Sequence, residues 1–303
     1  MSRWVDATLF LCLSVVWGLS FPAIAVGLEY VPPLFFAALR YDVAAVLLLA
    51  YAAVRLDGWY PSGRNNLVAI TGGGLFFVAG NGLLFVAQQT VPSSVAAIIQ
   101  ALLPIVTALW ALLLLGDRPT RAGLAGVVLG FVGIGFVIQP DPANLVAGDT
   151  VGRLLVVGQV ISVGLGGVII QWAGPDIGRV SLTGWSMLLG ALVLHVGSLL
   201  AREVPTAEAL APTAVGAIVY LGVFSTAVAF FIYFTILEEH GAFQAALVSY
   251  LVPVVATLVG VFVLGETLGL PSLVGFGLIA CGFALLKRRA ISDAIDDVVI
   301  GGG

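Results

Sequence analysis

The fold is decided by a stretch that the chain carries twice: AAIIQALLP at residues 96–104 and AALVSYLVP at residues 245–253. When the chain is aligned with itself at a shift of 149 residues, residues 91–133 lie over residues 240–282 without a gap. Self-similarity at a fixed distance is the signature of a duplicated unit. We therefore interpret the chain as an internal repeat and work outward from these two copies.

The positions that match are informative because they are not only leucine and valine, which are common throughout this sequence. Both copies keep a proline, Pro104 in the first and Pro253 in the second. Both also end in Leu-Gly followed by an acid, which is Asp117 in the first copy and Glu266 in the second. Matched proline, glycine and acid positions support the repeat beyond what the apolar composition alone would produce.

Composition places the chain in lipid. Of its 303 residues 60% are hydrophobic and 9% are charged, whereas soluble domains carry about 25% charged residues. The mean hydropathy is +1.14. This excludes an ordinary soluble enzyme, a disordered chain and a disulfide scaffold. A net charge of −4 excludes a nucleic-acid-binding surface, and two cysteines (Cys12 and Cys281) with two histidines predict no metal site and no cofactor.

Ten segments are long and apolar enough to cross a membrane as helices, which takes about 20 residues. They are residues 7–27, 34–54, 67–87, 95–115, 122–138, 153–173, 181–201, 213–236, 243–264 and 271–287. We predict an all-α polytopic membrane protein. Residues 1–140 form a first five-helix repeat, residues 150–289 a second, and residues 290–303 a tail. Because five is odd, the copies have opposite orientations, and inverted repeats are typical of secondary transporters.

The basic residues predict the orientation, because cytoplasmic loops carry an excess of Lys and Arg. With the N-terminus inside, the cytoplasmic side receives Arg3, Arg55, Arg64, Arg118, Arg121, Arg179, Lys287, Arg288 and Arg289. The other side receives Arg153 and Arg202, and Arg40 lies within a helix. We therefore expect a protein of the cytoplasmic membrane with both termini inside.

Arg40 and His195 are the least expected residues inside the segments. An arginine within a membrane helix costs about 2.5–3.5 kcal/mol even on insertion scales. Either Arg40 reaches the interface, or it faces a cavity and meets an anionic group of a substrate or another side chain. Asp42 lies on a different helix face from Arg40. His195, at a similar predicted depth, is either a packing residue or a proton-responsive cavity group.

Polar groups also accompany the two prolines. A proline deprives the carbonyl four residues earlier of its helical partner, and these residues are Gln100 and Ser249. We expect helices kinked at Pro104 and Pro253, with Gln100 and Ser249 bordering a central cavity. Tyr250 and the mid-helix Trp17 are the remaining candidate substrate-binding residues, alternatively serving as packing.

The motifs resemble one known family. WGLSF at residues 17–21 and PLFFAALR at residues 33–40 are similar to the first two helices of EamA-type members of the drug/metabolite transporter superfamily. The duplicated stretches with their Leu-Gly-acid ends resemble the same family, and the likeness covers nearly the whole chain. It implies a ten-helix inverted-repeat carrier with cytoplasmic termini that moves small metabolites, often exporting amino acids or related solutes. Trp17 and Arg40 match the family pattern, while Asp117 stands where glutamate is usual.

The sequence therefore predicts a secondary transporter, not an enzyme, that works by alternating access on an anionic or zwitterionic solute. No P-loop for an ATPase motor occurs, so energy comes from a gradient. A facilitator, an exchanger and a proton-coupled exporter stay open, as does a monomer or a homodimer. The alternatives from other classes are a membrane scaffold or sensor without transport, and a membrane-embedded enzyme.

Overall fold

A computed structural model describes residues 3–117, 120–139 and 148–288, and in this part of the chain every regular element is a helix. The α-helices are α1 (Arg3–Gly27), α2 (Pro33–Arg55), α3 (Arg64–Gly72), α4 (Gly82–Ala87), α5 (Ser93–Gln100), α6 (Leu103–Leu114), α7 (Arg121–Ile138), α8 (Gly148–Ala173), α9 (Arg179–Leu200), α10 (Pro212–Val219), α11 (Ala229–Phe262) and α12 (Leu270–Leu286). Two π-helical segments, η1 (Gly73–Val78) and η4 (Tyr220–Val228), and two 3₁₀ segments, η2 (Ala79–Asn81) and η3 (Ala207–Leu210), complete the order. The prediction of an all-helical protein is confirmed.

Eight stretches within the described ranges are long and apolar enough to span a membrane. They are Thr8–Gly27, Pro33–Arg55, Arg64–Ala87, Ser93–Leu114, Arg121–Ile138, Asp149–Ala173, Arg179–Leu200 and Pro212–Glu239. Two shorter apolar helices, Leu247–Phe262 and Leu270–Leu286, fall within the last two predicted segments. That all ten segments cross the membrane stays a prediction.

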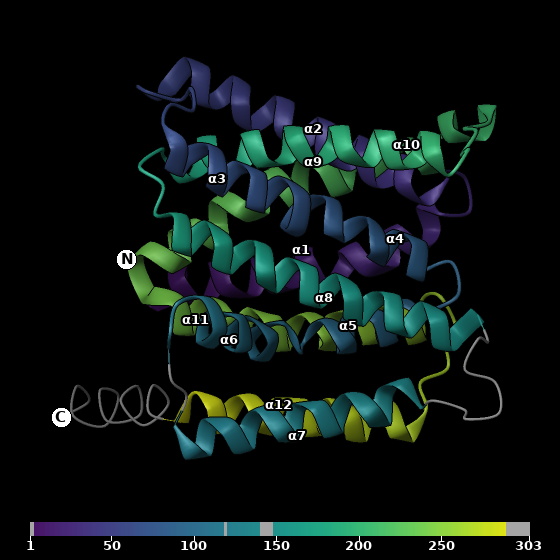
Figure 1. Cartoon of the computed structure of the whole chain (residues 1–303). Coiled ribbons are helices and arrows are strands. Elements are labelled where there is room, and N and C mark those ends of the chain that lie inside the picture. The colour runs from purple at the N-terminus through teal and green to yellow at the C-terminus, as the bar shows by residue number, and fades with distance from the viewer. Residues whose placement is uncertain (1–2, 118–119, 140–147, 289–303) are drawn as a thin grey trace.

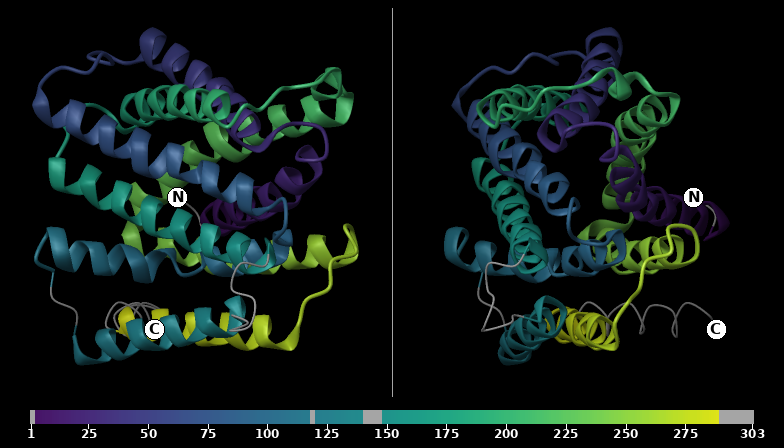
Figure 2. Two further views of the ribbon diagram at one scale, coloured as in Figure 1. Left: turned by 45° about the vertical axis from the view of Figure 1, so that its right-hand side comes forward. Right: turned by 90° about the vertical axis from the view of Figure 1, so that its right-hand side faces the viewer.

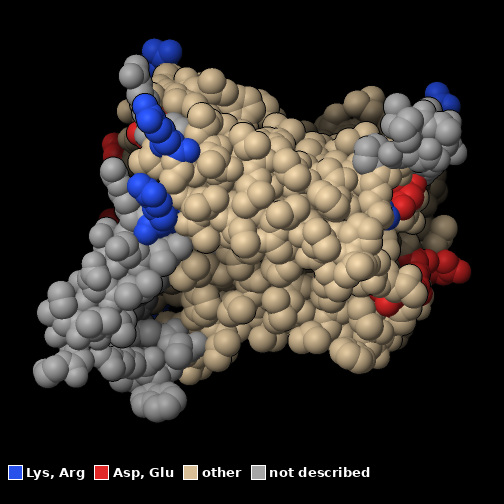
Figure 3. Space-filling model, turned by 90° about the horizontal axis from the view of Figure 1, so that it is seen from below, with Lys and Arg blue, Asp and Glu red and all other residues tan. Residues whose placement is uncertain are grey.

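The surface and the chain ends fit a membrane bundle. Seen from below, the surface is an uncharged band, and the charged side chains in view lie toward its two ends (Figure 3). The helices run roughly side by side, and α1 begins at the same end of the bundle at which α12 finishes (Figure 1). The chain therefore returns to the end at which it started, while the side of the membrane stays predicted from the arginines.

Two predicted boundaries differ from the structure. The segment predicted as one regular helix at 67–87 is α3, η1, η2 and α4 in succession. Gly72 precedes η1, and Gly73 and Gly74 begin it, so that no side chain resists its wider turn there. The gap between the predicted segments 213–236 and 243–264 is helical, because α11 continues through it. Residues 237–242 contain no proline, and a glycine within a helix costs only about 1 kcal/mol.

Helices α7 and α12 pack as a pair along one side of the bundle (Figures 1 and 2). Glycines allow this close approach. A Cβ added at Gly126 would collide with the carbonyl oxygen of Gly282, and one added at Gly133 would lie 2.7 Å from the carbonyl oxygen of Gly275. The shift of 149 relates Gly126 to Gly275 and Gly133 to Gly282. Exchanging the two repeats therefore turns the Gly126–Gly282 contact into the Gly275–Gly133 contact, as a twofold relation between the repeats requires.

A second reciprocal contact joins the first helix of each half to the proline-containing helix of the other. In α1, Gly18 lies against the side chain of Val255 in α11, and in α8, Gly164 lies against that of Val106 in α6. Val106 and Val255 are 149 residues apart, and the predicted segments 7–27 and 153–173 correspond at a shift of 146. The halves are thus interleaved rather than packed as separate bundles.

Distant charged residues satisfy the ends of several helices. The Glu266 carboxylate accepts the backbone N–H groups of Ser93 and Ser94 at the start of α5, at 2.7 and 3.0 Å. The Glu203 carboxylate accepts those of Leu34 and Phe35 at the start of α2, at 3.1 and 2.9 Å. Negative charge is stabilised at helix N-termini, where N–H groups lack partners.

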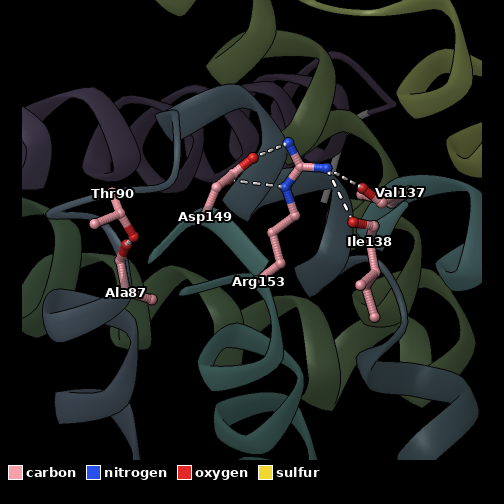
Figure 4. A network of polar contacts seen from close by, with 6 residues as sticks. All are labelled: Ala87, Thr90, Val137, Ile138, Asp149 and Arg153. Carbon is pink, nitrogen blue, oxygen red and sulfur yellow. Dashed lines mark hydrogen bonds and ion pairs between the residues drawn. The ribbon is translucent and has the colours of Figure 1, made fainter. Parts of the chain in front are cut away.

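The C-terminus of α7 is held by the complementary arrangement. Arg153 of α8 donates to the carbonyl oxygens of Val137 and Ile138, at 2.8 and 3.1 Å, and forms an ion pair with Asp149 (Figure 4). A guanidinium at a helix C-terminus meets unpaired carbonyls and the negative end of the helix dipole. This contact ties the end of the first half to the first helix of the second.

Candidate functional site

A contact between two equivalent residues marks the axis that relates the repeats. The Tyr250 hydroxyl of α11 donates to the carbonyl oxygen of Ala101, which lies between α5 and α6, at 3.4 Å. These residues are 149 apart, so they occupy the same position in the two repeats. Residues related by a twofold axis can touch each other only near that axis. The interruption between α5 and α6 therefore lies near the pseudo-twofold axis, where inverted-repeat carriers bind their substrates.

The backbone at this position is irregular in the first half and continuous in the second. Helix α5 ends at Gln100, and α6 begins at Leu103 with Pro104 in its first turn. The helix assignment of α11 runs through Pro253 without interruption. The side-chain oxygen of Gln100 is buried without a hydrogen-bond partner, while Ser249 is half-buried. An unpaired buried acceptor is costly, so a ligand or water that donates to Gln100 would be stabilised there.

Arg40 lies buried in α2 and turns toward η4. Its side chain is 9% exposed, its Nε donates to the Thr226 hydroxyl at 2.8 Å, and its guanidinium stands 5.2 Å from the Tyr41 ring centroid. Among the described residues no carboxylate lies within ion-pair distance of Arg40. A buried cation without a counter-ion is costly, and an anionic group placed here would relieve that cost.

Trp17 of α1 reaches the same π-helical segment from the other side. Its indole N–H donates to the carbonyl oxygen of Ser225 at 3.2 Å. Its ring also contacts two aromatic residues at the start of α11, Phe230 at 6.1 Å and Tyr233 at 5.6 Å between centroids. Aromatic rings supply large apolar contact areas with defined geometry. Trp17 and Arg40 thus both bond to residues of η4, and Trp17 also packs against the aromatic residues at the start of α11.

The two π-helical segments occupy equivalent places in the repeats. A shift of 149 carries Gly73–Val78 onto residues 222–227, which lie inside η4. The carbonyl oxygen of Phe76 accepts the Ser162 hydroxyl of α8 at 2.9 Å, and that of Ser225, the equivalent residue, accepts the Trp17 indole. A π-helical turn leaves carbonyls without regular partners and often marks a functional site.

His195 has a different surrounding from the other candidates. Its Nε2 lies 2.7 Å from the Asp42 carboxylate, across the contact between α9 and α2, and its ring meets Phe35 edge-on at 5.9 Å. Both side chains are about one-third exposed. The sequence predicted that Asp42 and Arg40 lie on different faces of their helix. In the structure Asp42 pairs with His195, whereas Arg40 bonds to Thr226. The sequence did not identify the pair itself.

The structure thus brings the predicted site residues together in two groups. Arg40 and Trp17 meet at η4, whereas Gln100 and Tyr250 lie at the interruption between α5 and α6. In the described contacts Ser249 and His195 belong to neither group. Sequence reasoning missed Thr226, although the adjacent hydroxyl residues Ser225 and Thr226 within an apolar run were a usable signal.

In the ranges that the structure describes, no three His, Cys, Asp or Glu side chains gather as metal ligands would.

Comparisons with known proteins agree with this architecture. The chain matches the EamA-like transporter family twice, over residues 6–139 and 150–288. It is 30% identical over 277 residues to the uncharacterized inner membrane transporter YedA of Escherichia coli (strain K12), covering 90% of this chain and 88% of that protein. It is 28% identical over 291 residues to a probable amino-acid metabolite efflux pump of Salmonella typhimurium, covering 93% and 94%.

The fold also occurs in a solved crystal structure. That protein superposes with a TM-score of 0.65 over 95% of this chain and 99% of its own, at 21% identity, which establishes a shared fold. The family matches cover both repeats, and the relatives are named as transporters rather than enzymes. This chain is a multi-pass membrane protein that belongs to the EamA-like transporter family of the drug/metabolite transporter superfamily.

Proposed function

We propose that this transporter carries a small anionic or zwitterionic metabolite, such as an amino acid or a related solute, across the cytoplasmic membrane. The observation that carries the proposal is Arg40, a buried cation whose described partners are a hydroxyl and an aromatic ring. A carboxylate of the solute would supply the missing counter-ion. The amino-acid efflux named for one relative supports the same solute class.

The proposed transport mechanism is alternating access between two inverted five-helix halves, residues 1–140 and 150–289, as a monomer or a homodimer. The two family matches and the reciprocal glycine contacts support this division. The interrupted helix α5–α6 and the π-helical segments η1 and η4 are the places where the backbone departs from regular helix. Such departures are where bundle helices bend most readily. Both termini are assigned to the cytoplasm on the arginine distribution.

Flux into proteoliposomes tests the proposal. Purified protein is reconstituted, and uptake and exchange of radiolabelled amino acids are followed with and without a proton gradient. We expect Arg40→Gln to lower flux about 10–100-fold, because a charge-assisted hydrogen bond contributes about 1.5–3 kcal/mol. Arg40→Lys keeps the charge and should retain part of the flux, and Arg55→Gln, an exposed arginine, is the control. Wild-type flux in Arg40→Gln would refute the role of Arg40, and no flux across the panel would favour a scaffold.

Cysteine labelling tests the position of the cavity independently of the substrate. Cys12 and Cys281 are both exposed and are replaced first. Cysteines at 100 and 249 should then react with a polar, membrane-impermeant thiol reagent during turnover. A cysteine in place of Ala97, which is 0% exposed, should stay protected. Equal protection of Gln100→Cys, Ser249→Cys and Ala97→Cys would contradict the assignment of a cavity to this region.

A further inference from the structure

Helix α3 packs against α8 (Figure 1). An open groove lies along this contact. Its volume is about 580 Å³, and its walls include Leu67, Phe76 and Ile169. Gly72 leaves room for Ile169 to form the floor, because a Cβ there would collide with the isoleucine side chain. This α3–α8 groove is apolar apart from Thr71, whose hydroxyl donates to the Leu67 carbonyl oxygen, and Arg64, which lines one end.

The dimensions of the α3–α8 groove suit a single acyl chain. From Arg64 to Gly72 helix α3 advances by 8 residues, or about 12 Å at 1.5 Å per residue, and Phe76 lies about one further turn along, in η1. The hydrocarbon of one leaflet is about 15 Å thick, half of a ~30 Å core. Because Arg64 is the first residue of the membrane-length stretch, it lies at the depth of the lipid headgroups. The groove therefore has its charge where a headgroup lies and its apolar walls where a tail lies.

Arg64 is available for such a headgroup. It is exposed, and in the part of the chain that the structure describes it enters none of the ion pairs. A guanidinium binds phosphate through paired N–H donors. Basic positions next to membrane helices attract anionic lipids, each contributing about 1 kcal/mol.

The second repeat contains the equivalent groove without the charge. A groove of about 350 Å³ lies between α1 and α10, lined by Thr213, Ala217 and Tyr220 among others. The shift of 149 carries Arg64, Val68 and Thr71 of the first groove onto these three residues. The duplicated fold thus provides two related apolar grooves, and only the first has an arginine at the position where the second has a threonine.

We propose that the α3–α8 groove binds one anionic phospholipid, with its phosphate on Arg64 and one acyl chain along Leu67, Phe76 and Ile169. The equivalent α1–α10 groove takes lipid without preference for charge. This inference is independent of the transported solute, because the groove faces outward from the helices and Arg40 and Trp17 do not line it.

Native mass spectrometry of the lipids retained by the full-length protein tests the proposal. The protein is equilibrated in mild detergent with equal amounts of phosphatidylglycerol and phosphatidylcholine. We expect the wild type to retain phosphatidylglycerol about fivefold over phosphatidylcholine, which corresponds to about 1 kcal/mol. Arg64→Gln should bring this ratio to about one, while Arg55→Gln, an exposed arginine at the end of α2, should leave it unchanged.

Two further variants separate the groove from simple charge attraction. Thr71→Trp fills the α3–α8 groove and should lower retention of phosphatidylglycerol while leaving Arg64 in place. Thr213→Arg should add a second retained phosphatidylglycerol by giving the other groove its missing cation. Equal retention of the two lipids by wild type, or a preference that survives Arg64→Gln, overturns the proposal. Unchanged retention in Thr71→Trp overturns it as well, since Arg64 would then act without the groove.

Discussion

The link from Glu266 to α5 predicts a large loss of stability for a change in a loop. Its carboxylate accepts two backbone N–H groups, from Ser93 at 2.7 Å and Ser94 at 3.0 Å, and both serines are 0% exposed. Hydrogen bonds to a charged group contribute about 1.5–3 kcal/mol each. Because Glu266 is half-buried, we take the lower figure, which gives about 3 kcal/mol for the pair. Glu266→Ala removes both bonds and leaves two buried donors unpaired.

Thermal unfolding of the purified protein in detergent measures this loss. For a chain of this size, 1 kcal/mol corresponds to roughly 2–4 °C in Tm, so Glu266→Ala should lower Tm by about 6–12 °C. Glu266→Gln keeps one acceptor and should cost about half as much. Glu203→Ala, which uncaps α2 in the same way, should match Glu266→Ala, and the exposed Glu208 provides the control. A Tm for Glu266→Ala within about 1 °C of wild type would refute the capping argument.

Two other contacts give sharp predictions. Gly126→Ala should lower Tm by several degrees, because its methyl group would meet the Gly282 backbone and overpacking costs about 1–3 kcal/mol. Gly135→Ala is the control, and because it faces open space it should be neutral or stabilising. Equal effects of the two substitutions on Tm would refute the packing account of α7 and α12. Asp42→Asn and His195→Gln should show a coupling of about 0.5–3 kcal/mol in a double-mutant cycle of unfolding, and strictly additive losses would mean that the 2.7 Å pair contributes nothing.

The helical class could be predicted because ten segments are long and apolar enough to cross a membrane as helices. The repeat could be predicted because the chain matches itself at a shift of 149 residues. The shift of 149 also matches Gly126 with Gly275, and both glycines take part in the reciprocal contacts between α7 and α12. The break expected between the segments 213–236 and 243–264 is absent, because charged residues and one glycine are compatible with a continuous helix. There Glu238 pairs with Arg179 at 2.8 Å within the helical stretch.

Side-chain partners across the bundle could not be predicted, because they depend on how helices rotate against each other. Arg40 was identified by its depth, but its partner Thr226 is 186 residues away. Glu266 was identified only as the acid that ends the second copy of the repeat, and its contact with α5 depends on a helix that begins 173 residues earlier in the chain. The π-helical segments are properties of the backbone and have no side-chain pattern that distinguishes them from α-helix.

The two proposals made for this transporter both fall where the repeats differ. Helices α2 and α9 begin at residues 33 and 179, a shift of 146, which carries Arg40 onto Ser186, a buried residue without charge. Arg64 likewise corresponds to Thr213. In the proposed alternating access, contacts that the repeats share, such as those of Gly18 and Gly164, are preserved when the halves exchange roles, and we therefore expect the two conformations to have similar energy. A bound solute can shift the equilibrium between the two conformations only if its affinity for them differs. Such a difference in affinity can arise at a charged residue that is present in one half alone.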